Sequence, residues 1–355
     1  MRQGINVSGS LSRMLMADHS RRKIIAGING FGRLGLHLFR YWLLNRDSAS
    51  FSIGFINDPQ RSARDIAKSI KRDDVIGSIP NSVKCSGSKI VIDGAVTVVA
   101  TSEEDIADIP WHADTELIFE ASGKFTEEHL ARRHLRGRVK KVIITATSPT
   151  AHKTVILGVN HDEYEPKSHH VVSYGSCTVN AFVPIADVLH KAFTIKEAHV
   201  HVTHNTPLRE IEQQRKQTGR PLGEIATKNC TLRHSAPQLL PFLNDDFSVT
   251  YNMIPDAGVS LMDMSFRFKE KVSAQDVLGC LEKASKESHN VHLAIEKDNQ
   301  RSYHFVGHPA SAIIRASHIH QTGSWTHVSA WFDNENSATR VFDFANFLVN
   351  MGEIN

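Results

Sequence analysis

The chain has 355 residues, with 41 Lys and Arg against 38 Asp and Glu, four cysteines and a formal net charge of +3. This length predicts two domains, and the balanced charge without basic runs argues against a nucleic-acid-binding protein. The cysteines at positions 85, 177, 230 and 280 form no CxxC pair, which favours a reducing compartment such as the cytoplasm. No apolar run approaches the roughly 18 residues of a membrane span, so we expect no membrane partner.

Residues 1–22 contain four arginines and a single acid, Asp18, without the apolar segment of a secretory signal. We predict a disordered extension. A targeting peptide and a mis-assigned start remain open as alternatives.

The first structured segment is an apolar run over residues 23–28, which is typical of a buried parallel strand. It leads into a GxGxxG motif formed by Gly30, Gly32 and Gly35, and residues 34–43 then continue as a buried helix. Glycines at this position permit a tight turn and let the backbone approach a pyrophosphate at the helix N-terminus. The pattern predicts a dinucleotide-binding site.

A second strand over residues 51–56 ends in Asn57-Asp58-Pro59. Asp58 follows the last glycine by the distance at which an acid bonds a ribose diol and repels a 2′-phosphate. NAD is therefore the expected cofactor, and nearby Arg61 leaves a phosphorylated cofactor as an open alternative.

Further strands are predicted at residues 89–92, 96–100, 117–120 and 141–145, with a helix at 129–135. The alternation of strands and helices favours a doubly wound α/β domain up to about residue 147. Ser122, Gly123 and Thr145 end two of these strands. They are therefore additional candidates for contact with the cofactor, although an ordinary turn explains Ser122 and Gly123 equally well.

Cys177 opens a predicted amphipathic helix over residues 178–192, because apolar side chains recur there at helical spacing. The free N–H groups and the positive end of a helix stabilise a thiolate, so Cys177 is the candidate nucleophile. Taken alone, a buried structural cysteine is the simpler interpretation.

A strand over residues 195–203 follows, and it carries His199, His201 and, just beyond its end, His204. These histidines suggest a metal site, for which we find little support. Strand alternation places His204 on the face opposite the other two, and no carboxylate motif accompanies them. We expect no bound metal.

Residues 209–233 are polar and are predicted as an irregular excursion. Strands are predicted at 247–253, 259–268, 311–319 and 327–332, and helices at 274–288 and 339–351. Strands that follow one another without strict alternation indicate an α+β second domain with a mixed or antiparallel sheet. We divide the chain into a cofactor domain at 23–176 and a catalytic domain at 177–338. Whether residues 339–355 return to the first domain stays open.

Several segments together resemble phosphorylating glyceraldehyde-3-phosphate dehydrogenases from residue 23 to the end. They are Ile28-Asn29-Gly30-Phe31-Gly32-Arg33, Asn57-Asp58-Pro59, Gly158-Val159-Asn160-His161, Ser176-Cys177-Thr178-Val179-Asn180, Val306-Gly307-His308-Pro309 and Trp331-Phe332-Asp333-Asn334-Glu335. The cysteine segment is the most specific of these.

The resemblance implies that an aldehyde adds to Cys177, gives a hydride to NAD and leaves a thioester that inorganic phosphate releases. His204 stands at the family's spacing from the cysteine and is implied as the general base. The resemblance also implies a cytoplasmic homotetramer. Its cofactor contacts fall on Asn29, Gly30, Phe31, Gly32, Arg33, Asp58 and Asn334.

The implied phosphate-binding residues depart from the family pattern. Ser176 and Thr178 are kept, but the family's other threonines fall on Pro207 and Arg209, its Thr-Gly pair on Cys230 and Thr231, and its shared arginine on Met253. Losing a guanidinium removes a bidentate contact to phosphate.

Two explanations are open for these departures. In the first, Arg209 acts with Ser176, Thr178 and Thr231 to bind glyceraldehyde 3-phosphate. In the second, the pocket serves a different aldehyde. We favour the second explanation. A catalytically weak or inactive regulatory homologue that keeps the NAD site is the main alternative to an enzyme, and a metal hydrolase on His199 and His201 is the third.

Overall fold

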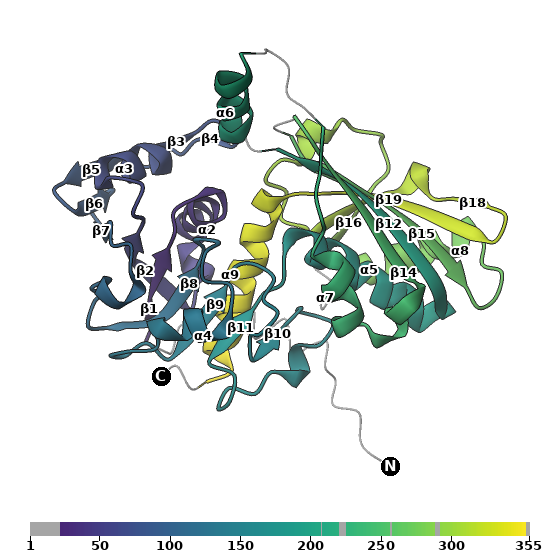
Figure 1. Ribbon diagram of the computed structural model, residues 1–355, viewed down its shortest axis with the longest axis horizontal. Helices are drawn as coiled ribbons and strands as arrows, with labels where there is room; N and C mark the ends of the chain where they lie inside the picture. The colour runs from purple at the N-terminus through teal and green to yellow at the C-terminus, as the bar shows by residue number, and fades with distance from the viewer. Residues whose placement is uncertain (1–21, 207, 220–224, 256–257, 288–291, 353–355) are drawn as a thin grey trace. The chain divides into compact units, whose positions relative to one another are not determined.

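The structure is a computed structural model that describes residues 22–206, 208–219, 225–255, 258–287 and 292–352. It separates into two compact units, residues 1–176 with 337–355 and residues 177–336, which are treated separately below (Figure 1). Of the predicted extension at 1–22, only Arg22 lies within the described residues. Pro207 and Ser288, the last residue of the predicted helix at 274–288, lie outside them.

The first unit is built on a sheet that has nine strands among the described residues. Their order across the sheet is β10 (Lys153–Thr154), β11 (Val171–Ser173), β9 (Lys141–Ile144), β8 (Thr115–Glu120), β1 (Ile24–Asn29), β2 (Phe51–Asn57), β7 (Val96–Thr101), β6 (Lys89–Ile92) and β5 (Val83–Ser86). All neighbours from β10 to β7 are parallel. The last three strands form an antiparallel meander, so the predicted alternation of strands and helices is interrupted there.

Helices α2 (Arg33–Leu44), α3 (Ala63–Lys71), α4 (Glu128–Ala131) and, from Ser337 onward, α9 (Asn334–Asn350) belong to this unit, with a short hairpin of β3 (Arg72–Asp73) and β4 (Gly77–Ser78). The predicted helix at 129–135 is shorter than expected and continues as a 3-10 turn over Arg132–His134. Apolar side chains of α2, β1, β2 and α9 share one core. The final helix therefore does pack on the first unit, as Tyr41 and Phe342 illustrate with ring centroids 5.2 Å apart.

The second unit is built on a mixed sheet that has eight strands among the described residues. Its order is β13 (Ala226–Thr227), β14 (Phe247–Ile254), β12 (Ile195–Asn205), β15 (Ser260–Phe268), β19 (Trp325–Phe332), β17 (Ala312–Arg315) and β16 (Leu293–Glu296), with β18 (His320–Thr322) paired to β19. The two parallel pairings, β12 with β14 and β16 with β17, sit among antiparallel ones. The predicted α/β and α+β architecture is confirmed.

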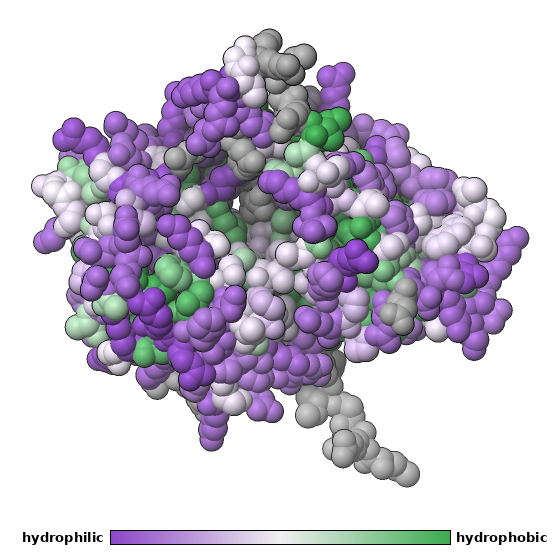
Figure 2. All heavy atoms as spheres, in the orientation of Figure 1, coloured by the Kyte–Doolittle hydropathy of each residue, from purple (hydrophilic) through white to green (hydrophobic). Residues whose placement is uncertain are grey.

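Helices α5 (Cys177–Phe193), α7 (Leu232–Leu239) and α8 (Ala274–Lys286) pack in this unit, and α6 (Leu208–Thr218) precedes β13 (Figure 1). Phe182 of α5 stacks on Phe247 and Phe266 at centroid distances of 5.2 and 6.2 Å, which fixes α5 against the sheet. In the part of the chain that the structure describes, no helix is long and apolar enough to cross a membrane. Figure 2 shows a face on which hydrophilic side chains predominate.

Sequence reasoning misjudged two of these elements and missed a third. Residues 209–233 are not irregular throughout, because α6 covers most of their first half. Its Glu, Gln, Arg and Lys residues have high helix propensity but form no apolar stripe, so periodicity does not reveal the helix. Helix α3 was not predicted, and the strand expected at 311–319 stops at Arg315, where a 3-10 turn begins.

Candidate active site

The loop after β1 is shaped by two glycines that leave no room for a side chain. Gly30 has φ +90°, and a Cβ atom there would lie 2.4 Å from Cα of Ser122 at the end of β8. A Cβ atom on Gly35 would lie 2.3 Å from the carbonyl oxygen of Gly30. The loop therefore fits tightly between β8 and the start of α2. Gly32, by contrast, is exposed and has no atom within 4 Å of its Cβ position.

Asp58 ties the end of β2 to this loop. Its Oδ2 accepts a hydrogen bond from Phe31 N at 2.7 Å, and its Oδ1 accepts one from Gln60 N at 2.9 Å. The carboxylate thus stands beside the start of α2, where backbone N–H groups point away from the strand. An open approach at Gly32 with a fixed acid beside it suits the pyrophosphate and ribose of a dinucleotide.

A buried polar network holds the ends of the neighbouring strands together. Glu120 at the end of β8 accepts hydrogen bonds from Asn29 Nδ2 at 2.6 Å, from His134 Nε2 at 2.8 Å and from Ser122 N at 2.9 Å. Asn57 of β2 donates to Asn29 Oδ1 at 2.9 Å. Because a buried carboxylate is costly unless it is hydrogen-bonded, this network strongly favours one geometry of the strand ends.

The remaining predicted cofactor residues lie around this network, with two exceptions. Ser122 donates its hydroxyl to Glu120, Gly123 adopts φ +71°, and the N and Oγ1 of Thr145 donate to the Glu120 carbonyl at 3.0 and 3.1 Å. Arg33 lies near His37 instead, whose pKa is lowered mainly by burial and to a smaller extent by the charge of Arg33. Asn334 is the first residue of α9, and its side chain lies outside the described residues.

In the second unit, Cys177 is the first residue of α5, as predicted. The apolar side chains that predict this helix, among them Val179, Phe182 and Val183, are buried. Helix α5 spans about 24 Å from Cys177 to Phe193. Strand β12 then runs back for about 30 Å as far as His204. Because the strand returns over a length similar to that of the helix, Cys177 and His204 come close together although they are 27 positions apart in the chain.

The thiol of Cys177 and the imidazole of His204 lie within contact distance of each other. The Sγ atom of Cys177 lies 3.5 Å from Nε2 of His204, within the distance for a hydrogen bond to sulfur. His204 is buried, and its Nδ1 lies 2.8 Å from the backbone carbonyl of Asn205. A carbonyl only accepts, so Nδ1 carries the proton and the lone pair of Nε2 faces the thiol. Ser260 Oγ, which donates to Asn205 Oδ1 at 3.0 Å, helps to hold this turn of chain.

The pKa of Cys177 moves in the direction opposite to the prediction. Desolvation of its sulfur is the largest effect, and with the charges of Asp333 and Cys230 it raises the pKa to about 12. Backbone N–H groups of Thr178 and Cys177 favour the thiolate, as expected for a helix start, but burial outweighs them. In this state the thiol is protonated at neutral pH and requires a base to become nucleophilic.

The predicted substrate residues are divided between described and undescribed side chains. Thr178 is buried beside Cys177, and Ser176 is half-buried. Thr231 is exposed just before α7, and burial raises the pKa of the neighbouring Cys230 thiol, an effect that Thr178 opposes. Arg209 belongs to α6, but its side chain lies outside the described residues.

The residue at the position where the resemblance implies an arginine is apolar and lies beside His204. Met253 is 7% exposed and is the register partner of His204 on the adjacent parallel strand β14. Neighbouring residues in register point to the same face of a sheet, so the thioether of Met253 lies next to the imidazole of His204. This contact could not be read from the motif spacing alone.

The other histidines of β12 are engaged with hydroxyl groups. His199 and His201 lie 2.8 and 2.7 Å from the hydroxyl oxygens of Ser248 and Thr250 on β14. In the described ranges no group of three potential metal ligands is found. Sequence reasoning gave Asp333 and Glu120 no role in the two sites, although Asp333 directly precedes Asn334 and Glu120 ends a predicted strand.

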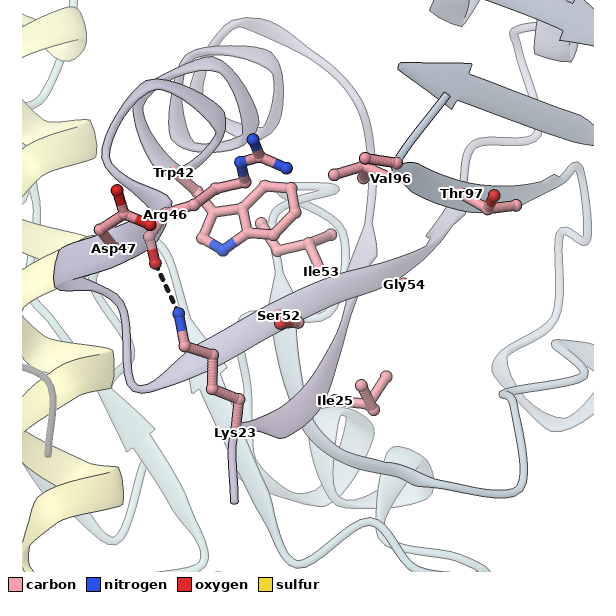
Figure 3. Close-up of a pocket in the computed structure, with 11 residues that line it drawn as sticks. Lys23, Ile25, Trp42, Arg46, Asp47, Ser52, Ile53, Gly54, Val96 and Thr97 are labelled. Carbon is pink, nitrogen blue, oxygen red and sulfur yellow. Dashed lines mark hydrogen bonds between the residues drawn. The ribbon is translucent and has the colours of Figure 1, made fainter. Parts of the chain in front are cut away.

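A cavity of about 460 Å³ in the first unit is separate from these residues (Figure 3). It lies at the amino-terminal ends of β1, β2 and β7, where Lys23, Trp42, Ser52 and Thr97 contribute to its walls. The candidate cofactor residues lie at the opposite, carboxyl ends of these strands, where nucleotides bind in open α/β sheets. The cavity is therefore not part of the candidate site.

Comparison with known proteins gives matches over both units. Residues 24–128 match the family model "Glyceraldehyde 3-phosphate dehydrogenase, NAD binding domain", and residues 176–334 match "Glyceraldehyde 3-phosphate dehydrogenase, C-terminal domain". Glyceraldehyde-3-phosphate dehydrogenase 1 of Bacillus cereus is 31% identical over 335 residues, which cover 92% of this chain and 98% of the relative. The Geobacillus stearothermophilus enzyme of that name is 30% identical with the same coverage, and a cytosolic one from Chlamydomonas reinhardtii is 31% identical over 91% of this chain and 96% of the relative.

Proposed function

The chain belongs to the glyceraldehyde-3-phosphate dehydrogenase family, and from this premise we propose that it oxidises an aldehyde with NAD through a thioester on Cys177. The observation that carries the proposal is the contact of 3.5 Å between the Cys177 thiol and His204 Nε2. A thiol whose pKa is raised to about 12 needs an adjacent base, and His204 offers its lone pair to it.

The first step forms a covalent bond between protein and substrate. His204 Nε2 takes the thiol proton, and Sγ attacks the aldehyde carbon. The electrons of the C=O bond move to oxygen, where the N–H groups at the start of α5 stabilise the negative charge. The Asn205 carbonyl accepts from Nδ1 and so stabilises the protonated imidazole.

Oxidation then follows at the same carbon. When bound, NAD supplies the acceptor for the hydride that this carbon loses. Loss of the hydride re-forms the C=O bond and leaves a thioester on Cys177. Inorganic phosphate attacks the thioester carbon, the C–S bond breaks, and His204 returns the proton to the thiol. The products are an acyl phosphate and the original cysteine.

For the cofactor, we propose that the loop from Asn29 to Arg33 binds the pyrophosphate and that Asp58 bonds the adenosine ribose. Ser122, Gly123 and Thr145 complete this region, and Asn334 is assigned to the nicotinamide amide. Support comes from the tight turn at Gly30, the open approach at Gly32 and the fixed carboxylate of Asp58.

For the substrate, Ser176, Thr178, Thr231 and Arg209 are proposed contacts. The buried Met253 beside His204 favours an aldehyde other than glyceraldehyde 3-phosphate, because a thioether does not bind phosphate. The paired thiol and imidazole argue against an inactive regulatory homologue. We further propose a cytoplasmic location, since all four cysteines are free and one relative is described as cytosolic. The homotetramer is proposed from the family resemblance alone.

A substrate screen tests the proposal. Phosphorylated and non-phosphorylated aldehydes are supplied with NAD, with and without inorganic phosphate, and NADH is followed by absorbance. We expect turnover with at least one aldehyde and a dependence on phosphate. Turnover that ignores phosphate indicates release by water, and the absence of any NADH across the panel contradicts an aldehyde dehydrogenase.

A further inference from the structure

One carboxylate joins the two chain segments on either side of the dinucleotide turn. Glu120 ends β8, which runs parallel to β1 in the same sheet (Figure 1). Its Oε2 accepts a hydrogen bond at 2.6 Å from Nδ2 of Asn29, the last residue of β1. Its Oε1 accepts one at 2.9 Å from the backbone N of Ser122, in the loop after β8, and a second from the Ser122 hydroxyl. The two oxygens of one side chain therefore set the separation of these two segments.

Gly30 follows Asn29 and lies directly against the loop after β8. A Cβ atom on Gly30 would be 2.4 Å from Cα of Ser122. The backbone N of Ala121 donates to the Asn29 carbonyl, and that of Gly30 donates to the Asn57 carbonyl, both at 2.7 Å. The turn at Gly30 is thus enclosed by neighbouring strand ends. Because this turn brings backbone N–H groups to a pyrophosphate, the separation of the segments decides how closely those groups approach the ligand.

The side chain of Asn29 is used inside the protein. Asn29 is 3% exposed, its Nδ2 donates to Glu120, and its Oδ1 accepts from Asn57 Nδ2 at 2.9 Å. Both ends of the carboxamide are therefore engaged within the strand ends. Asn29 acts on a ligand through the position of its backbone, and Glu120 acts on the ligand through Asn29.

His134 is a third partner of the same carboxylate. It is fully buried, and its Nε2 lies 2.8 Å from Oε2 of Glu120. A carboxylate accepts hydrogen bonds, so Nε2 carries the proton. A buried carboxylate is costly unless donors surround it. Asn29, Ser122 and His134 supply these donors from three separate segments, which defines where the carboxylate lies.

We propose that Glu120 and His134 are positioning residues of the cofactor site, which set the affinity for the pyrophosphate part of NAD by fixing Asn29 relative to Ser122. Both side chains are buried and act through their neighbours. The inference rests on the proposed function, because that function assigns the loop after β1 to the pyrophosphate. It adds two residues to which neither the glycine motif nor the resemblance assigns a role.

The test begins with Glu120→Gln in the full-length protein. The variant keeps the shape of the side chain but turns one acceptor oxygen into an NH₂ donor, which then faces the donors of Asn29 or Ser122. In calorimetric titrations, the Kd for NAD and the Kd for ADP-ribose should rise about 10- to 100-fold. The Kd for adenosine, which has no pyrophosphate and depends on Asp58, should stay as in wild type.

Glu116→Gln is the matched control on the same strand. Glu116 is buried at the opposite end of β8, where its Oε2 accepts from Nη2 of Arg22 at 2.7 Å and its Oε1 lies 3.7 Å from Nη2 of Arg138. This variant also removes a buried charge, so urea denaturation should show a loss of stability as it does for Glu120→Gln. Its Kd for NAD should equal that of wild type.

His134 provides a second pair of variants. His134→Leu removes the donor to Glu120 and should raise the Kd for NAD and ADP-ribose. His134→Gln carries an NH₂ donor and should bring both constants back towards those of wild type. If Glu120→Gln does not fold, these two variants decide the inference by the same titrations.

The inference is overturned if Glu120→Gln or His134→Leu binds NAD as tightly as wild type, if Glu116→Gln weakens NAD equally, or if adenosine is weakened together with ADP-ribose. The titrations need no aldehyde. A wild type that binds NAD through Glu120 but oxidises no aldehyde contradicts the proposed function alone. Aldehyde oxidation together with an unchanged Kd in Glu120→Gln contradicts the inference alone, and a wild type that binds no NAD contradicts both.

Discussion

The dinucleotide loop of the first unit and the thiol site of the second unit differ in how their polar groups are stabilised. In the loop, Asn29, Glu120, His134 and Asn57 satisfy one another through buried hydrogen bonds, so the strand ends are fixed before any ligand arrives. At the thiol site, the sulfur is desolvated and its pKa is raised, so the nucleophile is kept protonated. On the proposed mechanism, binding is favoured by a preformed polar frame, whereas the chemistry is controlled by a proton that His204 removes.

The largest effect that separates the two regions is expected from the base. His204→Asn removes the acceptor for the Cys177 proton, and kcat/KM for aldehyde oxidation should fall by about 10²- to 10⁴-fold. NAD binding, measured by fluorescence titration, should not change. His201→Asn is the control, because His201 bonds to Thr250 on the other face of β12. Equal activity of the two variants would break the assignment of the base.

A smaller effect is expected in the loop. Gly30→Ala places a methyl group against Ser122 and forces alanine into positive φ, so the free energy of unfolding should fall by about 1–3 kcal/mol. Urea denaturation measures this change. Gly32→Ala, where no atom lies within 4 Å, should change stability by less than about 1 kcal/mol. If both variants lost stability equally, close packing at Gly30 would not explain the glycine.

The smallest effect concerns the charge beside the thiol. After desolvation, the charge of Asp333 is the next largest cause that raises the pKa of Cys177, so Asp333→Asn should lower this pKa and increase the thiolate fraction below it. Alkylation by iodoacetamide between pH 7 and 9 should become about two- to tenfold faster. Asp298→Asn, at an exposed position of the same unit, should react like wild type. A slower reaction of Asp333→Asn would contradict the electrostatic explanation.

The sequence predicts the framework of both regions better than their interiors. The glycine motif, Asp58 and the helix starting at Cys177 were visible, because each depends on local backbone geometry or on helical periodicity. The approach of Cys177 to His204 followed from the family spacing and agrees with the lengths of α5 and β12. The sign of the pKa shift did not follow, because desolvation depends on packing between elements that lie far apart in the chain.

Contacts between neighbouring strands could not be predicted from the sequence either. Nothing local to Met253 indicates that it pairs in register with His204. Glu120 was noted only as the end of a strand, although it anchors the loop through Asn29 and His134. Helix α6 was missed because its mostly polar residues form no apolar stripe.

The covalent intermediate is the most direct test of the central claim. An aldehyde that supports turnover is mixed with enzyme and excess NAD in the absence of inorganic phosphate, and the reaction is quenched in acid after the first turnover. We predict a burst of NADH close to one per active site and an acyl group on the peptide that contains Cys177. A burst retained by Cys177→Ala, or an acyl group on another residue, would contradict the account.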